Sequence, residues 1–244
     1  MIFTTSWDDG TLSDLRIAEL LDRYNCTGTF YACPATQSCY GERVLKADEL
    51  ERIGAHHELG AHSLSHPHLP KLPEECAWEE ITGSKEWMEE QTGKPCTMFC
   101  YPYGDADERT QSLVEKAGFK GARSTEAWKF SADDPFLLHT SLHLYPFPIR
   151  PILNRRCIDP IRRALPHLRS LCLPIVAYRS WFALATHLFE YAENHTLPFF
   201  HLWGHGWEIE KYRMWNHLER FLSFVSTKKN IQHAPNSAIL SFLR

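Results

Sequence analysis

Hydrophobic and polar positions alternate between two periods along the first 125 residues. Short apolar and β-branched runs at residues 2–7 and 27–33 predict strands. Between them, residues 12–24 carry apolar side chains at helical spacing, which predicts an amphipathic helix. The same alternation predicts further strands at 57–61, 95–101 and 120–124, and helices at 47–53, 73–92 and 108–117. Strands that alternate with helices through short loops are typical of an α/β fold with parallel strands.

The alternation stops between residues 126 and 156 and then resumes. This stretch contains Pro135, Pro146, Pro148 and Pro151, and it predicts a long loop with one short strand near 137–144. Loops of this length in compact domains often bind substrate. Beyond it, the pattern predicts helices at 158–171, 181–194 and 209–226 and an apolar strand at 197–203. We see no repeat or linker, so we expect residues 1–244 to form one catalytic domain.

Composition and charge narrow the possible functions. The 244-residue chain is 43% hydrophobic and 23% charged, and its net charge of −4 gives no general attraction for nucleic acid. It has no apolar run of about 18 residues and no signal-peptide pattern at its start. We therefore expect a cytoplasmic protein with no membrane span and no nucleic-acid partner, and its oligomeric state stays unknown. The eight cysteines are expected to be free, buried thiols.

Two adjacent carboxylates, Asp8 and Asp9, follow the first predicted strand. Because side chains alternate along a strand, one carboxylate can bind a metal while the other approaches a metal-bound water. Gly10 allows the sharp exit that the backbone needs at this point. A plain surface turn is the alternative interpretation of the same three residues.

Two histidines four residues apart, His62 and His66, follow the strand predicted at 57–61. One helical turn would place both imidazoles on one face, at about 2.0–2.1 Å from a shared zinc ion. Pro67 disfavours a longer helix, so we predict a single turn within a loop. Two loop histidines without a metal are the alternative interpretation.

An aromatic turn follows the strand predicted at 95–101. It reads Tyr-Pro-Tyr-Gly and contains Tyr103, which makes it suited to lining a groove, although a plain loop with aromatic packing fits the same residues. The three motifs share one address, the carboxyl end of a predicted strand. In α/β barrels this is the end where active sites are built.

Two more histidines come late in the chain. His205 follows the strand predicted at 197–203, and its neighbours Trp203 and Trp207 could lower its basicity or stack on a substrate ring. His201 lies within the predicted strand, where a buried core histidine is the alternative to a functional one.

The order and content of these motifs resemble the polysaccharide deacetylase family, which includes chitin and peptidoglycan N-acetylglucosamine deacetylases. Residues 6–10 are similar to its Thr-Phe-Asp-Asp-Gly motif, residues 60–69 to its His-Ser/Thr-x-x-His motif, and residues 99–104 to its Arg-x-Pro-Tyr/Phe-Gly motif. The resemblance covers roughly residues 2 to 225. It implies a distorted (β/α) barrel, usually with seven parallel strands.

The resemblance also implies a metal site and a general base. Asp9, His62 and His66 would hold one divalent metal, most often Zn²⁺, with Co²⁺ or Ni²⁺ as options. Asp8 would take a proton from the metal-bound water. The implied reaction is the hydrolysis of an N-acetyl group on an amino sugar.

The resemblance implies the remaining roles at the site as well. His205 would be the general acid that protonates the leaving amine, with His201 as the competing assignment. A backbone N–H near Tyr103 would help to stabilise the oxyanion. Trp203 and Trp207 are candidates for substrate contact.

Two departures from the family pattern affect the base. The family's third motif begins with an Arg that orients the base, and here Cys100 stands in its place. Arg123, at the end of the next predicted strand, is the candidate replacement. The family's Asp-Trp motif, which often supports that Arg, is not evident.

The sequence therefore predicts a metal-dependent amidohydrolase that deacetylates an oligosaccharide, a polysaccharide or a cytoplasmic glycan precursor. One alternative is the hydrolysis of another linear or cyclic amide on the same fold. A second alternative is a degenerate protein that binds metal and glycan without turnover. Asp8 disfavours the second alternative, because a pure metal-binding module needs no second carboxylate.

Overall fold

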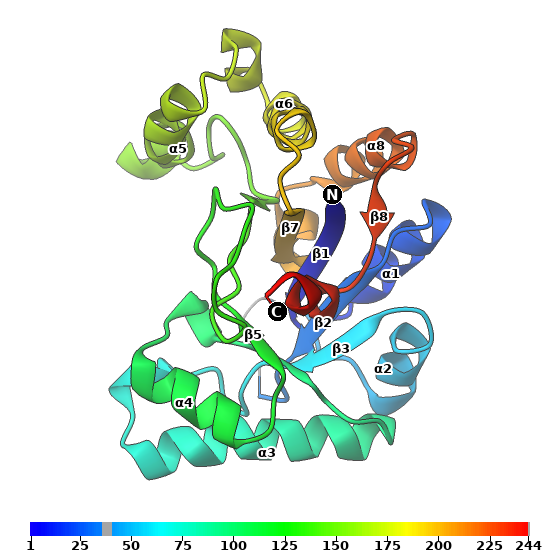
Figure 1. The fold of residues 1–244 in the computed structure, drawn as a ribbon, viewed down its shortest axis with the longest axis vertical. Helices are drawn as coiled ribbons and strands as arrows, with labels where there is room; N and C mark the ends of the chain where they lie inside the picture. Colours follow the sequence, from blue (N-terminus) through cyan, green and yellow to red (C-terminus); the bar gives the residue numbers. More distant parts are fainter. Residues whose placement is uncertain (36–40, 244) are drawn as a thin grey trace.

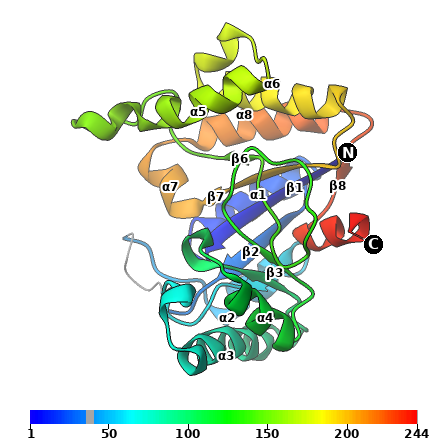
Figure 2. The same ribbon diagram turned by 60° about the vertical axis from the view of Figure 1, so that its left-hand side comes forward.

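The computed structural model describes residues 1–35 and 41–243, and it contains one parallel β-sheet surrounded by helices (Figures 1 and 2). The strands are β1 (Ile2–Asp9), β2 (Gly28–Ala32), β3 (Glu58–Ala61), β4 (Met98–Cys100), β5 (Gly121–Arg123), β6 (Leu142–His143), β7 (Phe199–His205) and β8 (Gln232–His233). The main helices are α1 (Asp14–Arg23), α2 (Ala47–Ile53), α3 (Glu74–Thr92), α4 (Glu108–Lys116), α5 (Asp159–Ser170), α6 (Trp181–Asn194), α7 (Gly206–Lys211) and α8 (Trp215–Ser226).

The sheet follows the order β5-β4-β3-β2-β1-β7-β6, with every neighbouring pair parallel. The segment that follows β5 bends back along it, because the N–H of Leu138 donates to the carbonyl of Ala122 and the N–H of Ser124 donates to the carbonyl of Leu138. The same segment then enters β6, which pairs with β7. This segment links the two sides of the sheet, and the predicted distorted barrel with seven parallel strands is confirmed. The short strand β8 adds a further parallel pairing to β1.

Two apolar layers hold the sheet. The larger layer lies between the sheet and the outer helices α1–α4, α6 and α8. The smaller layer lies on the inner face, where the C-terminal 3-10 helix η5 (Asn236–Phe242) packs against the strands (Figure 1). Its buried members are Ile2, Tyr31, Met98, Cys100, Leu138, Phe199, Ala234 and Ile239. The strands therefore have apolar neighbours on both faces, as buried parallel strands do.

Most predicted elements form within a few residues of the expected bounds, but the helix predicted at 209–226 is wrong. The structure has two helices, α7 and α8, separated at residues 212–214. Arg213 takes a left-handed conformation with φ of 56°, which breaks the hydrogen-bond ladder between them. Helical spacing of apolar residues on both sides of the break concealed it, since each half packs its own apolar face inward.

The described cysteines are all free thiols, and Cys39 lies outside the described residues. The prediction that the cysteines are buried is wrong for Cys76 and Cys172, which are exposed, and for Cys157, which is half-buried. Among the described residues, no helix combines the length and the apolar character needed to cross a membrane.

An aromatic cluster behind β1 and β7 is expected to carry a large share of the stability. Phe221 of α8 is fully buried, and its ring packs edge-on against Phe3 of β1 at 6.1 Å and at a tilt against Phe200 of β7 at 5.9 Å. We expect Phe221→Ala to lower the free energy of unfolding by about 3–5 kcal/mol, because a cavity remains. Phe242→Ala, at a side chain that is 53% exposed, is the matched control and should cost less than about 1 kcal/mol. Urea denaturation checks this, and equal costs would contradict it.

Candidate functional site

The predicted site residues other than His201 meet at the carboxyl ends of the strands. The β1–β7 register sets Asp8 beside His205, and the β4–β5 register sets Cys100 beside Arg123. His62 comes directly after β3. Because all these strands are parallel, their carboxyl ends share one edge of the barrel, which is the address expected from the sequence.

Asp9, His62 and His66 bring three potential metal ligands together. Nε2 of His62 lies 3.7 Å from Oδ1 of Asp9, and Nε2 of His66 lies 3.6 Å from the same oxygen. Two ligands bound tetrahedrally at about 2.0–2.2 Å from a zinc ion lie about 3.4 Å apart, so these separations suit one divalent ion. The Nδ1–H of His62 donates to the carbonyl of Cys100 at 2.8 Å, which leaves the lone pair of Nε2 for the ion.

His66 and Asp9, the other two residues of this group, are also in states that can bind a cation. Burial, followed by the neighbouring His62, lowers the pKa of His66 to about 4, so its imidazole is neutral near pH 7. The indole N–H of Trp207 donates to Oδ2 of Asp9 at 2.8 Å and so fixes the carboxylate orientation. One carboxylate and two imidazoles form a donor set that suits Zn²⁺, Co²⁺ or Ni²⁺.

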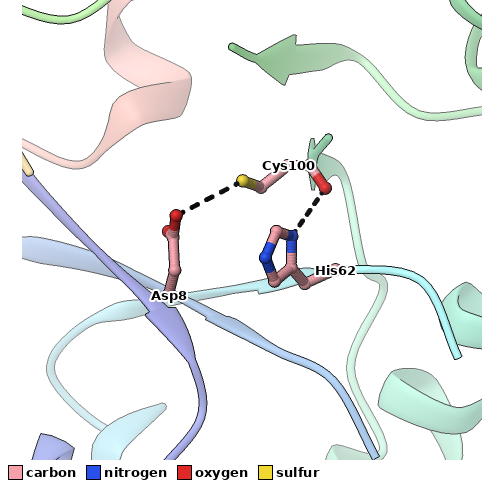
Figure 3. A group of neighbouring side chains, drawn as sticks. All are labelled: Asp8, His62 and Cys100. Atoms are coloured by element: carbon pink, nitrogen blue, oxygen red, sulfur yellow. Dashed lines mark hydrogen bonds between the residues drawn. The ribbon is translucent and has the colours of Figure 1, made fainter. Parts of the chain in front are cut away.

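Cys100 forms a second possible ligand group with Asp8 and His62 (Figure 3). Burial raises the pKa of the Cys100 thiol well above its usual value, so the thiol stays protonated. Its S–H donates to Oδ2 of Asp8 at 3.8 Å. Since the thiolate is the form that binds metals, the group around Asp9 is the better metal site.

Asp8 forms a buried ion pair with Arg123. The Nη2–H of Arg123 donates to Oδ1 of Asp8, and both side chains are almost inaccessible to solvent. Burial by itself raises the pKa of Asp8, but the charge of Arg123, followed by those of His62 and His205, outweighs it and lowers the pKa to about 2. Asp8 is therefore ionised at neutral pH, and its partner is Arg123, the residue that the sequence offers as the replacement for the family's arginine.

The backbone around the site holds several residues in the left-handed region. Asp9, Ser63, His66 and Tyr103 have φ values of 79°, 61°, 58° and 60°. Non-glycine residues adopt this conformation at a cost of about 1–3 kcal/mol each, and they concentrate where a side chain must be aimed. The single helical turn predicted for residues 62–66 is wrong for this reason, since two of these left-handed residues re-aim the histidines instead. The hydroxyl of Ser63 accepts from the N–H of His66 at 3.0 Å and fixes this bend.

His205 is held by a carboxylate that sequence reasoning did not single out. Its Nδ1–H donates to Oε2 of Glu208 at 2.6 Å, and the Nε2–H of His143 donates to the same oxygen at 2.9 Å. Burial by itself lowers the pKa of His205, but the hydrogen bond and charge of Glu208, followed by Asp9 and Asp8, raise it to about 9. His205 is therefore protonated near pH 7.

One signal in the sequence could have indicated the role of Glu208. This residue follows His205 by three residues at the start of α7, so one helical turn places the two side chains together. His143 gave no such signal, because it reaches Glu208 only through the pairing of β6 with β7.

The structure does not bring His201 to the metal-ligand group. Along β7 it lies four residues before His205, which is about 13 Å of strand. Its Nδ1–H donates to the carbonyl of His139 at 3.0 Å, and its Nε2 accepts from the hydroxyl of Ser6 at 2.8 Å and the amide of Asn236 at 3.2 Å. Burial lowers the pKa of His201 to about 3. This is the environment of a neutral, hydrogen-bonded core histidine.

The aromatic candidates lie on different sides of the site. Tyr103 is 56% exposed and packs edge-on against His66, with ring centres 4.5 Å apart. Trp203 is buried between the guanidinium of Arg123, at 5.1 Å, and the ring of His143, at 4.0 Å. Tyr103 is thus open to a ligand, whereas Trp203 supports the residues around Asp8 and His205.

Comparison with known proteins agrees with this arrangement. The family described as Polysaccharide deacetylase matches residues 2–122, which include the carboxylates of β1, both histidines and the Tyr103 turn. The chain belongs to the polysaccharide deacetylase family. It is a divergent member, because the peptidoglycan-N-acetylglucosamine deacetylase PgdA of Listeria monocytogenes is 27% identical over 127 residues. That match covers 51% of this chain and 26% of PgdA, so the chain spans about a quarter of its relative.

Solved structures of the family share the fold. A Mycobacterium smegmatis protein assigned to the polysaccharide deacetylases is 16% identical, with a TM-score of 0.65 over 99% of this chain and 90% of that one. The peptidoglycan deacetylase PdaC of Bacillus subtilis is 15% identical, with a TM-score of 0.57 over 98% and 90% of the two chains. A mutant of BA3943, a pseudoenzyme of the CE4 family, is 11% identical, with a TM-score of 0.59 over 98% and 67%. At these identities the likeness establishes the barrel alone.

The ion pair of Asp8 with Arg123 predicts a large effect of removing one partner. We expect Arg123→Met to lower the free energy of unfolding at pH 7 by about 3–5 kcal/mol, because it leaves a buried carboxylate without its cation. The double variant Arg123→Met/Asp8→Asn should recover most of this loss, since the unpaired charge is gone. Chemical denaturation of the three proteins checks the prediction, and a double variant as unstable as Arg123→Met would contradict it.

Proposed function

We propose that this chain is a metal-dependent hydrolase that removes the N-acetyl group from an amino sugar. The observation that carries the proposal is the position of the Asp9, His62 and His66 group beside a second, ionised carboxylate, Asp8, which Arg123 holds in place. A carboxylate next to a three-ligand site is the arrangement that metal-assisted hydrolysis requires.

The first half of the reaction would use Asp8. A divalent metal held by Asp9, His62 and His66 would polarise the acetyl carbonyl and make water more acidic. Asp8 would take the proton of the attacking water through Oδ2, because its Oδ1 is engaged by Arg123. The weak S–H donor of Cys100, at 3.8 Å, leaves Oδ2 able to accept that proton.

The second half would use His205. Its protonated imidazole donates Nδ1–H to Glu208, so Nε2–H is the proton available to the leaving amine. The β1–β7 register sets Asp8 and His205 side by side, so base and acid flank one position. The backbone N–H of Tyr103 is our candidate donor to the oxyanion, and its exposed ring is our candidate for sugar contact.

Metal content tests the proposal directly. Protein purified without added metal should carry close to one Zn²⁺, Co²⁺ or Ni²⁺ per chain by elemental analysis. Asp9→Ala and His62→Ala should each weaken binding beyond the roughly 10–100-fold that loss of an outer hydrogen-bond partner costs. His68→Ala is the matched control, because His68 is outside the ligand group and pairs with Asp105.

Acetate release completes this test. Wild-type protein with metal should release acetate from N-acetylglucosamine oligomers, and Asp8→Asn should keep the metal but lose about 10²–10⁴-fold in rate. A wild type that takes up none of the three metals would contradict the proposal. Metal binding without acetate release from any N-acetyl sugar would favour a degenerate binding protein. BA3943, which has the same fold, is described as a pseudoenzyme.

Glu208 should set the alkaline limit of activity. Activity requires protonated His205 and is lost as pH rises through the pKa of that residue, which Glu208 raises. We expect Glu208→Gln to move the alkaline limb of kcat/KM to lower pH, since the amide no longer favours the imidazolium. Glu210→Gln, on the same helix but exposed and bonded to Trp215, is the control. An unchanged alkaline limb in Glu208→Gln would show that His205 is not the acid.

A further inference from the structure

The segment of residues 149–180, here named the cap, has a charge unlike that of the rest of the chain. It contains seven arginines and one acidic residue, Asp159, so its formal charge is +6, while the whole chain carries −4. The remaining residues therefore carry −10. The cap comprises the 3-10 helices η3 (Arg155–Ile158) and η4 (Ile175–Tyr178) together with α5. Figures 1 and 2 show it at one end of the molecule, away from α3 and α4.

The positive charges of the cap arginines are not neutralised by carboxylates in the described part of the fold. Among the described residues, none of the seven forms an ion pair, and six of them are exposed. Arg150 is the partly buried one, and it donates to the hydroxyl of Tyr145. On α5, Ala164 and Leu168 face the fold, whereas Arg162 and Arg169 lie seven residues apart on one outward stripe.

The cap also exposes large apolar side chains. Five of the nine large hydrophobic residues that are exposed in the described chain lie in it: Ile149 (58%), Leu153 (109%), Ile158 (51%), Ile175 (83%) and Val176 (39%). Large apolar side chains that are exposed together on one segment are typical of an interaction site.

The unpaired arginines and the protruding aliphatic side chains together match the chemistry of an anionic bilayer. An anionic bilayer attracts the cations and takes up the apolar side chains at the boundary of headgroups and acyl chains. A second cap would repel this one, because both carry the same charge. A nucleic acid would meet the arginines but would leave the aliphatic side chains in water.

We propose that the cap docks on an anionic membrane surface as a peripheral binding element. Binding there would also hold the catalytic edge near the lipid. A cavity of about 320 Å³ is lined by Asp159 and Arg163 of α5 on one side and by His143 on the other, and His143 donates to Glu208 of the site. Residues of the cap and a residue that contacts Glu208 thus line the same cavity.

Vesicle binding tests the proposal. Purified full-length protein is sedimented with vesicles of equal parts phosphatidylcholine and phosphatidylglycerol, and with vesicles of phosphatidylcholine alone. We expect binding to the anionic vesicles that weakens as salt is raised, and little binding to the neutral ones. Arg162→Glu/Arg169→Glu should lower the partition coefficient at least about 30-fold, because each cation near such a surface contributes about fivefold and two cations are lost.

Two further variants make the test specific. Lys116→Glu/Lys120→Glu reverses two exposed, unpaired cations beside α4, at the other end of the molecule, and should bind as the wild type does. Leu153→Ser/Ile175→Ser keeps every charge and removes two of the most exposed side chains, so it should fold normally and bind anionic vesicles more weakly. If the arginine variant fails to fold, the vesicle binding of this variant still tests whether the cap binds the membrane.

The proposal would be overturned by wild-type protein that ignores anionic vesicles, by equal binding to neutral ones, or by an equal loss in the Lys116→Glu/Lys120→Glu variant. It would also be overturned if sedimentation without lipid showed that the cap variants change only the oligomeric state, which would assign the patch to a second copy. None of these outcomes depends on acetate release, so they are independent of the proposed catalytic function.

Discussion

The ion pair between Asp8 and Arg123 joins two strands that a flat sheet would keep far apart. In the order β5-β4-β3-β2-β1, four strand spacings separate Arg123 from Asp8, which is about 19 Å in a flat sheet. No arginine side chain spans that distance, so the contact exists only because the sheet curls. Both charges are buried, and each would be costly without the other. The curvature of the sheet and the ionisation state of Asp8 therefore depend on one another.

The rest of the inner face is arranged to support this pair. Cys100 and Arg123 are register neighbours on β4 and β5, so the guanidinium that contacts Asp8 comes from the strand next to Cys100. The protonated thiol of Cys100 donates to the second oxygen of Asp8, and its carbonyl orients His62. One residue that departs from the family pattern thus touches both the carboxylate and a candidate ligand, and the charge it lacks comes from the neighbouring strand.

The group around His205 also depends on a residue from a neighbouring strand. Glu208 receives two imidazole N–H groups, from His205 on β7 and from His143 on β6. Trp203 packs against His143 of this network and against Arg123, the partner of Asp8. The same buried indole therefore contacts both the group around Asp8 and the group around His205. Deeper in the barrel, His201 has its hydrogen bonds filled by Ser6, His139 and Asn236, which keeps the polar groups below the site satisfied.

The sequence by itself determined the local elements and the residues nearest to them. Periodicity gave the strand–helix order, and motif spacing placed Asp8, Asp9, His62 and His66 at strand ends, because these features depend on neighbours within a few positions. The sequence did not reveal the helix break at Arg213 or the left-handed bend at His66. A single residue with positive φ changes the direction of the chain but leaves the spacing of the residues around it unchanged.

Only the tertiary structure decided which distant groups share the site. The pairing of Arg123 with Asp8 was a candidate until the curl of the sheet was known, and the contact of His143 with Glu208 depends on β6 pairing with β7. The positions of His201 and His205 were likewise set by register along one strand. Contacts of this kind arise from the packing of whole elements, and chain-local spacing carries no information about packing.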